Sequence, residues 1–159
     1  MDNVHDRVEV GSEAICALGQ PGLGVVHACK SPCHQRAVGY RGSLPKDHPN
    51  YLSLRQGNDL YLNIIDPQIP LFPDDLFRVY LPFAREVWDS GATLRVHCNQ
   101  GESRAPSLAI VFLAKHVGAI SNESAERARA DFLQLFPRYM PGRGIQKYLS
   151  ENWSKFDAF

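Results

Sequence analysis

The sequence predicts an α/β fold in which helices flank a central mixed, mostly parallel sheet. Two observations predict it. Short apolar runs of strand length precede segments whose apolar residues recur at helical spacing, and the chain has 159 residues, of which 44% are hydrophobic. That length and composition suit one α/β domain with a substantial core. We therefore expect residues 1–159 to form a single domain, without repeats or a linker.

The strands are expected at apolar runs bounded by turn residues. Two early strands, 9–18 and 22–29, lie on either side of a turn at Gln20 and Pro21. A central strand is expected over 59–65 and another over 93–97. A helix fits between the last two strands, which predicts that they are parallel, because parallel neighbours need a crossover connection.

The helices are expected where apolar residues share one face. Positions 76, 80, 84, 87 and 88 are apolar at helical spacing, which predicts a helix over 74–89 with a kink at Pro82. Capping residues delimit the later helices. They are expected over 105–117, from Ser121 or Asn122 to Leu135, and from Pro141 through Tyr148 to Trp153.

The most informative segment lies between the strand at 93–97 and the helix at 105–117. It reads His97-Cys98-Asn99-Gln100-Gly101-Glu102-Ser103-Arg104, so five residues separate a cysteine from an arginine. A strand, a tight loop and a helix N-terminus bind phosphate, because backbone N–H groups and the helix dipole favour negative charge. Cys98 then supplies a thiolate nucleophile, and the Arg104 guanidinium suits two phosphate oxygens at once. The alternative is a strand, turn and helix with an ordinary buried cysteine.

Two further residues of this segment have expected roles. Gly101 allows backbone conformations that a Cβ forbids, so the loop can close tightly. His97 precedes Cys98 on a strand, where neighbouring side chains point to opposite faces. We expect His97 to brace the loop by hydrogen bonding rather than to act as a base.

This segment, followed by Ala105, Pro106 and Ser107, resembles the active-site loop of the cysteine-dependent protein tyrosine phosphatases, most closely the compact dual-specificity branch. The resemblance covers residues 55–155 and implies a dual-specificity-phosphatase-like fold. It also implies hydrolysis of phosphotyrosine, and of phosphoserine or phosphothreonine, through a cysteinyl-phosphate intermediate. Residues 97–104 would form the phosphate-binding loop, and the reaction would need no metal or other cofactor.

Such a reaction also needs an acid for the leaving oxygen, and Asp66 is the best candidate. It follows an apolar run and precedes Pro67, which forbids further strand pairing. The separation, 98 − 66 = 32 residues, resembles the spacing of acid and nucleophile in dual-specificity phosphatases. Asp74 and Asp75 are rivals, but acids at a helix start normally complement its dipole. The plain alternative for Asp66 is a turn residue. Low-molecular-weight tyrosine phosphatases place the acid after the loop, so the order here argues against them.

Two positions depart from the common family pattern. Most members have Ser or Thr directly after the arginine, where the hydroxyl assists departure of the cysteine sulfur, but this chain has Ala105. Relatives known as phosphatases of regenerating liver also carry Arg-Ala-Pro there, so alanine is compatible with activity, although the second step is expected to be slow. Family members acting on phosphoinositides often have lysine where this chain has Glu102, which argues against highly anionic lipids.

Residues 30–50 are expected to form a substrate-facing loop. The segment is rich in Pro, Gly and His and is too long for a mere connector. If the preceding strand runs parallel to 93–97, this loop overhangs the catalytic crevice. Basic side chains would then be available to a phosphorylated substrate. They are Lys30, His34, Arg36 and Arg41.

The other cysteines suggest two weaker hypotheses. His27, Cys29, Cys33 and His34 together offer four possible zinc ligands in eight residues, but no second Cys pair completes the usual layout, so no metal is expected. Alternatively, Cys29 or Cys33 lies near Cys98 and traps its oxidised form as a disulfide.

Charge and composition limit the partners. The formal net charge is zero, with no basic block, which argues against broad nucleic-acid or membrane surfaces. The N-terminus lacks the basic start and apolar core of a signal peptide, and the apolar run 108–114 is too short to span a bilayer, so we expect a cytoplasmic protein. The expected partner is a phosphorylated protein substrate; nothing specifies an oligomeric state. The alternatives are a phosphatase for a small-molecule, lipid or RNA 5′ phosphate, or a catalytically weak pseudophosphatase that only binds phosphorylated groups.

Overall fold

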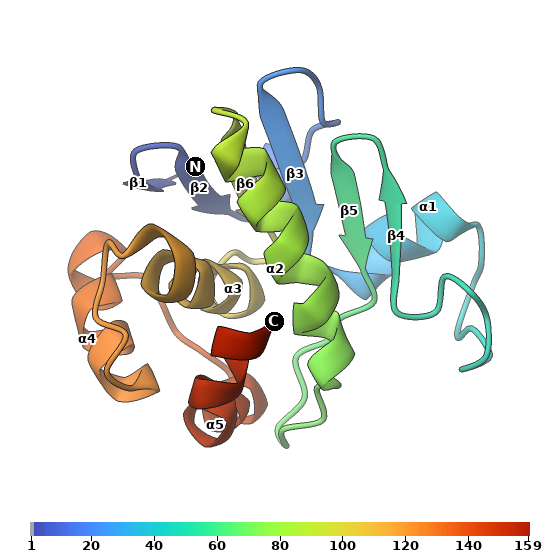
Figure 1. Ribbon diagram of the computed structural model, residues 1–159. Coiled ribbons are helices and arrows are strands. Elements are labelled where there is room, and N and C mark those ends of the chain that lie inside the picture. The colour runs from blue at the N-terminus through green and yellow to red at the C-terminus, as the bar shows by residue number, and fades with distance from the viewer. Residues whose placement is uncertain (1) are drawn as a thin grey trace.

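The protein forms an α/β fold around one six-stranded mixed sheet (Figure 1). The structure is a computed structural model, and it describes residues 2–159. The strand order across the sheet is β1-β2-β6-β3-β5-β4. The strands are β1 (Asp2–His5), β2 (Val8–Gly11), β3 (Leu23–His27), β4 (Ser53–Gln56), β5 (Asp59–Leu62) and β6 (Thr93–His97).

The centre of the sheet is parallel and its two edges are antiparallel. β6 pairs in parallel with β2 on one side and with β3 on the other, and β3 pairs in parallel with β5. The edge strands β1 and β4 run antiparallel to β2 and β5. The carboxyl ends of the four inner strands therefore meet at one edge of the sheet, which is where α/β proteins bind ligands.

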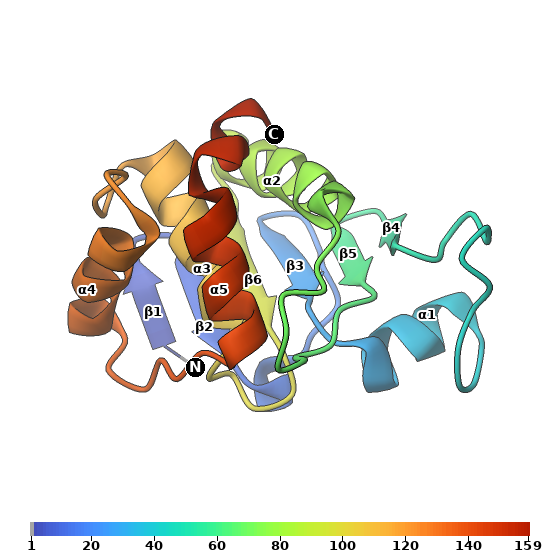
Figure 2. The same ribbon diagram turned by 90° about the horizontal axis from the view of Figure 1, so that it is seen from below.

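The larger helices lie together on one face of the sheet (Figures 1 and 2). They are α2 (Asp74–Asp89), α3 (Arg104–Phe112), α4 (Ala125–Leu135) and α5 (Arg143–Asn152). A turn of wider helix over Leu113–Val117 extends α3, and a 3₁₀ helix over Trp153–Ala158 follows α5. The short α1 (Gln35–Val38) follows a helical segment over Lys30–His34 and lies beside the β4 edge.

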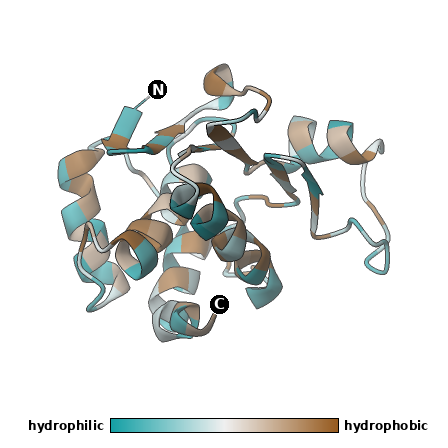
Figure 3. Cartoon of the chain, turned by 45° about the horizontal axis from the view of Figure 1, so that its top comes forward, coloured by the Kyte–Doolittle hydropathy of each residue, from teal (hydrophilic) through white to brown (hydrophobic). Residues whose placement is uncertain are grey.

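Successive side chains of a strand point to opposite faces of the sheet, and the two faces of this sheet have different surroundings. Leu94 and Val96 of β6 point into the main core with α2 and α3, whereas His97 lies outside that core although it is fully buried. Figure 3 shows hydrophobic residues along the inner strands and on the helix sides that face them. The sheet therefore carries an apolar core on one face and buried polar groups at one end of the other face.

Several expected elements agree with the structure. The helix over 74–89 and the strand over 93–97 have the expected bounds, and β3 lies within the expected 22–29. That strand pairs in parallel with 93–97, which is the condition on which the expected substrate-facing loop depends. α2 contains Pro82, which is exposed, and continues past it to Asp89; the kink expected there stays a prediction.

Other expectations are wrong in their bounds. The strand expected over 9–18 ends at Gly11, because Ser12 caps a 3₁₀ turn over Glu13–Ile15. The strand expected over 59–65 ends at Leu62. The cap of α4 is Ser124, whose side chain accepts from the Arg127 N–H, rather than Ser121 or Asn122. Among residues 2–159, no helix combines the length and the apolar character needed to cross a membrane.

Candidate active site

The loop between β6 and α3 wraps around the sulfur of Cys98. Cys98 is almost fully buried, and its Sγ accepts a hydrogen bond of 3.2 Å from the Gly101 N–H. The Cys98 N–H donates to the Gly11 carbonyl of the neighbouring strand over 3.3 Å. The loop thus directs a backbone N–H at the sulfur from one side, while the neighbouring strand holds the backbone of Cys98 from the other.

Only glycine fits at position 101. Gly101 has φ +77°, in the left-handed region. A Cβ there would lie 2.6 Å from backbone atoms of Gly11 and Ser12, which no side-chain movement can relieve. The tight loop that the sequence predicts therefore depends on a missing Cβ, both for its dihedral angle and for its close approach to β2.

Arg104, the first residue of α3, is held at the loop by hydrogen bonds from both terminal nitrogens of its guanidinium. Nη1 donates to the Ile64 carbonyl over 3.1 Å, and Nη2 donates to Asn99 Oδ1 over 2.7 Å. The buried Nε finds no partner among residues 2–159. A buried charged donor without an acceptor is costly, so this N–H suits an anion bound in the loop.

Asn99 connects the loop to two other segments. Its Nδ2 donates to the Ser31 carbonyl over 2.9 Å and to Glu13 Oε2 over 3.1 Å. The Glu13 N–H donates in return to the Asn99 carbonyl over 3.2 Å. The segments after β2 and β3 therefore hold the loop from outside.

A pocket of about 450 Å³ opens over Cys98 and gathers most of the residues that the sequence singled out. It is lined by Asp66, Cys98, Asn99, Gln100, Glu102, Ser103, Arg104, Met140, Pro141 and Gly142. Sequence reasoning missed Met140, Pro141 and Gly142 as pocket residues. The only signal was the helix start at Pro141, and their proximity follows from the tertiary fold.

Asp66 lies at this pocket on an irregular segment four residues beyond the end of β5. Its side chain is exposed, and a Cβ on Gly142 would collide with its carboxylate. Gly142 is fixed in turn, because its N–H donates to Ser103 Oγ over 2.8 Å. The expectation that the strand itself ends at Asp66 is wrong, yet Asp66 still lines the pocket over Cys98.

The rival acids have other contacts. Asp74 accepts a hydrogen bond of 2.6 Å from the Tyr148 hydroxyl, which lowers the pKa of this carboxyl. Asp75 pairs with Arg78 on the exposed side of α2. Neither residue lines the pocket over Cys98.

Comparison with known proteins identifies the fold. No protein-family model and no curated protein sequence matches the chain. The human tyrosine phosphatase-like serine/threonine/tyrosine-interacting protein matches its structure with a TM-score of 0.66 at 16% identity, over 98% of this chain and 97% of that one. Cydia pomonella PTP-2 phosphatase matches with a TM-score of 0.63 at 19% identity, over 95% of this chain and 88% of that one. Human DUSP28 matches with a TM-score of 0.61 at 16% identity, over 99% of this chain and 96% of that one. The chain has the dual-specificity phosphatase fold.

Within this fold, His97 lies on the opposite face of the sheet from Cys98. Its Nε2 is 2.8 Å from His27 Nδ1, and His27 Nε2 is 2.7 Å from Asp59 Oδ1. Burial, with a smaller contribution from His27, lowers the pKa of His97 to about 4. His97 is therefore neutral near pH 7, and it belongs to a buried chain of polar groups with His27 and Asp59; its role in bracing the loop stays a prediction.

The basic residues expected in a substrate-facing loop do not surround the pocket over Cys98. His34 is fully buried, 2.7 Å from the Tyr40 hydroxyl and 2.9 Å from the Asn50 carbonyl. It braces its own segment, so the expectation that it is available to substrate is wrong. Lys30 lines a neighbouring pocket, and Arg36 and Arg41 line a third. These three remain candidates only for contacts with more distant parts of a substrate.

The four residues considered as zinc ligands from the sequence alone are not brought together as a set. His34 makes the contacts just described, and Cys29 lies in a small cluster with Cys33 and Tyr61. The neighbouring Cys33 thiol and, less strongly, Arg104 lower the pKa of Cys29. All four cysteines are free, and a disulfide between Cys98 and Cys29 or Cys33 stays a prediction.

Proposed function

We propose that this chain is a cysteine-dependent phosphomonoester hydrolase that acts on phosphorylated proteins, with phosphotyrosine, phosphoserine and phosphothreonine as substrates. One observation carries the proposal: the Cys98 sulfur, under the Gly101 N–H, shares a pocket with an arginine whose buried Nε lacks an acceptor within residues 2–159. A phosphoryl group in this pocket would supply that acceptor and place phosphorus against the sulfur.

The proposed reaction has two steps. The Cys98 thiolate attacks phosphorus, the bond from phosphorus to the leaving oxygen breaks, and Asp66 protonates that oxygen. Water then attacks the cysteinyl phosphate, Asp66 takes the water proton, and the bond from phosphorus to sulfur breaks. The loop amides and Arg104 stabilise the charge on the equatorial oxygens in both steps, which is the main task in phosphoryl transfer.

The lining of the pocket supports monophosphorylated substrates. Glu102 places a carboxylate beside neutral Asn99 and Gln100, and it would repel additional phosphates. One structural neighbour, PTPMT1, has been solved in complex with PI(5)P. A lipid monophosphate is therefore the comparison substrate for this proposal, although the proposed substrates are proteins.

The test uses single substitutions and two classes of substrate. Cys98→Ser should reduce hydrolysis of an aryl phosphate more than about a thousandfold while retaining binding of a phosphopeptide. Asp66→Asn should slow the hydrolysis of a phosphopeptide by about 10²–10³-fold. It should slow the hydrolysis of an aryl phosphate with a good leaving group much less. Asp75→Asn, an exposed acid outside the pocket, is the control. Wild-type turnover in Cys98→Ser, or equal losses on both substrates in Asp66→Asn, would contradict the assignments.

A phosphate-binding module without turnover is the second candidate. Ala105 favours it, because a hydroxyl that assists the second step in most relatives is missing, and one structural neighbour is a tyrosine phosphatase-like interacting protein. Hydrolysis of a generic aryl phosphate by the wild-type chain distinguishes the two. A panel of phosphopeptides, phosphoinositides and nucleotides then identifies the substrate class.

A further inference from the structure

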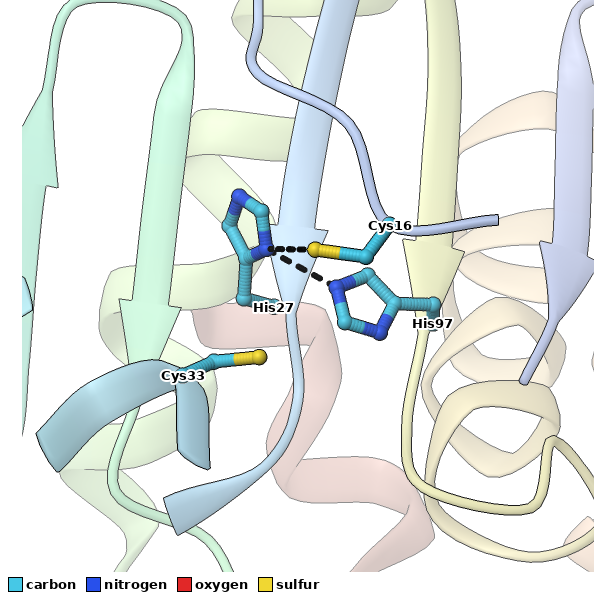
Figure 4. Close-up of side chains that lie close together, drawn as sticks. All are labelled: Cys16, His27, Cys33 and His97. Atoms are coloured by element: carbon cyan, nitrogen blue, oxygen red, sulfur yellow. Dashed lines mark hydrogen bonds between the residues drawn. The ribbon is translucent and has the colours of Figure 1, made fainter. Parts of the chain in front are cut away.

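Four metal-ligating side chains meet on the face of the sheet opposite the nucleophile (Figure 4). They come from separate segments: Cys16 follows the turn after β2, His27 ends β3, Cys33 lies in the segment before α1, and His97 ends β6. The two sulfurs and the two ring nitrogens all lie within 4.8 Å of one another.

The spacing of these atoms is close to that of a tetrahedral site. Bond lengths of about 2.3 Å to sulfur and 2.0 Å to nitrogen place tetrahedral ligands roughly 3.3–3.8 Å apart. Cys16 Sγ lies 3.6 Å from His27 Nδ1, which fits this range. His27 Nδ1 and His97 Nε2 are 2.8 Å apart, the distance of a hydrogen bond. An ion would replace the proton between these nitrogens and separate them by about half an ångström.

The surroundings hold His27 as a ligand. Its Nε2 lies 2.7 Å from Asp59 Oδ1, which fixes the proton on that nitrogen and leaves the lone pair of Nδ1 directed at the cluster. The Gly19 N–H fixes Asp59 in turn, at 2.9 and 3.0 Å from its two oxygens. Tyr61 stacks on the His27 ring at 4.2 Å and 7°. A carboxylate behind a histidine ligand is the usual second layer of zinc sites.

Burial provides a closed site with an entrance. His27, Cys33 and His97 are buried, whereas Cys16 is exposed. An ion can therefore enter from the side of Cys16 and be enclosed by the other three ligands. Two thiolates would neutralise a divalent charge, which removes most of the cost of burying it.

We propose that Cys16, His27, Cys33 and His97 bind one Zn²⁺ ion. Two sulfurs and two imidazole nitrogens in a closed tetrahedron are the ligand set that zinc prefers in structural sites. Binding releases the protons of the two thiols, moves the His97 proton from Nε2 to Nδ1, which has no partner among residues 2–159, and forms four bonds to the metal. The ion takes no part in phosphoryl transfer, so this proposal is independent of the proposed function.

The site would hold the base of the phosphate-binding loop. His97 directly precedes Cys98, and Asn99 bonds to Glu13 and Ser31, which lie three and two residues before Cys16 and Cys33. Zinc would thus tie together β6 and the two segments that hold Asn99. We expect bound zinc to raise the melting temperature of the protein, because it binds the folded state only.

The test measures metal in a Cys98→Ser background, so that the nucleophile cannot act as a ligand. After expression in zinc-supplemented medium, elemental analysis should find about one zinc per chain. Reconstitution with Co²⁺ should give the visible absorption of a tetrahedral ion and thiolate-to-cobalt charge-transfer bands. Chelation should lower the melting temperature, and Zn²⁺ should restore it.

The matched variants are Cys16→Ser, Cys33→Ser and Cys29→Ala. The first two should each weaken metal binding at least about tenfold and lose charge-transfer intensity, whereas Cys29→Ala, a buried cysteine outside the set, should retain both. Less than a tenth of an equivalent of zinc in the Cys98→Ser protein, or full binding in a Cys16→Ser, Cys33→Ser double variant, would overturn the proposal. A Cys16–Cys33 disulfide in anaerobically purified, metal-free protein would also overturn it. The chelation measurement needs no ligand substitution, so it decides the matter even if those variants fail to fold.

Discussion

At the scale of single residues, Ala105 is expected to govern the second half of the reaction. It is fully buried directly after Arg104, where most relatives carry a hydroxyl that assists departure of the sulfur. We expect a burst of phenol release from an aryl phosphate followed by a slow steady rate. Ala105→Ser should raise the steady rate roughly tenfold, about 1.4 kcal/mol of barrier, and reduce the burst amplitude. Rapid-quench kinetics measure both, and a linear wild-type progress curve without a burst would contradict this prediction.

Gly144, the second residue of α5, packs closely against the segment that carries Asp66. A Cβ there would lie within 2.5 Å of the Pro67 and Ile69 carbonyl oxygens, which belong to the segment that carries Asp66. Gly144→Ala should therefore displace this backbone and reduce kcat by about 100-fold, because a shift of about 1 Å is enough to misplace a catalytic group. Alkylation of Cys98 by iodoacetamide should stay near the wild-type rate, since the loop is untouched.

Gln146→Ala, an exposed change on the same helix, is the control for this prediction. A Gly144→Ala variant that folds and keeps the wild-type kcat would show that the Asp66 segment does not depend on this contact.

At the scale of elements, the sequence predicted best those helices and strands whose structure follows from the pattern of their own residues. The helix over 74–89 matches α2, because Leu76, Tyr80, Ala84 and Val87 repeat at helical spacing and are all buried. Strands β1 and β4 were missed. Each has four residues at a sheet edge, and each forms because a partner strand offers its backbone, which local patterns do not report.

The same distinction applies to the site. Cys98 and Arg104 are one loop apart, so their spacing alone predicts a shared phosphate site, and both line one pocket. The cluster of Cys16 with His97 joins residues 81 positions apart (97 − 16) and was not predicted. The chain around Cys16 was expected to be a strand, and such a strand would have carried this cysteine away from the end of β6.

The contact of α2 with the sheet depends on a glycine in β3. A Cβ on Gly24 would lie 2.3 Å from one methyl carbon of Val87 and 2.8 Å from the other. Gly24→Ala should therefore cost about 1–3 kcal/mol of unfolding free energy by overpacking. In a Val87→Ala background the same change should cost at least about 1 kcal/mol less, because the missing methyls leave room. Urea unfolding of the four proteins gives this coupling energy, and purely additive effects would contradict the steric explanation.

At the scale of the whole molecule, the end of the chain completes the core. Phe156 in the final 3₁₀ helix is 1% exposed and packs against Phe77 of α2 with ring centroids 4.8 Å apart. It also contacts Tyr148 of α5, whose hydroxyl bonds to Asp74 at the start of α2. The last turn thus fastens α5 to α2, the helix that links β5 to β6 and hence the Asp66 segment to the loop of Cys98.

Phe156→Ala should accordingly destabilise the molecule as a unit. Loss of a fully buried phenyl ring leaves a cavity between two helices, which should cost about 3–5 kcal/mol in urea unfolding. Leu71→Ala is the control, since that side chain is 69% exposed and its loss should change stability by less than about 0.5 kcal/mol. If the fold is cooperative, Phe156→Ala should move the unfolding midpoints followed by tryptophan fluorescence and by Cys98 reactivity to the same urea concentration. Two separate midpoints would show instead that the C-terminal turn unfolds on its own, without the catalytic loop.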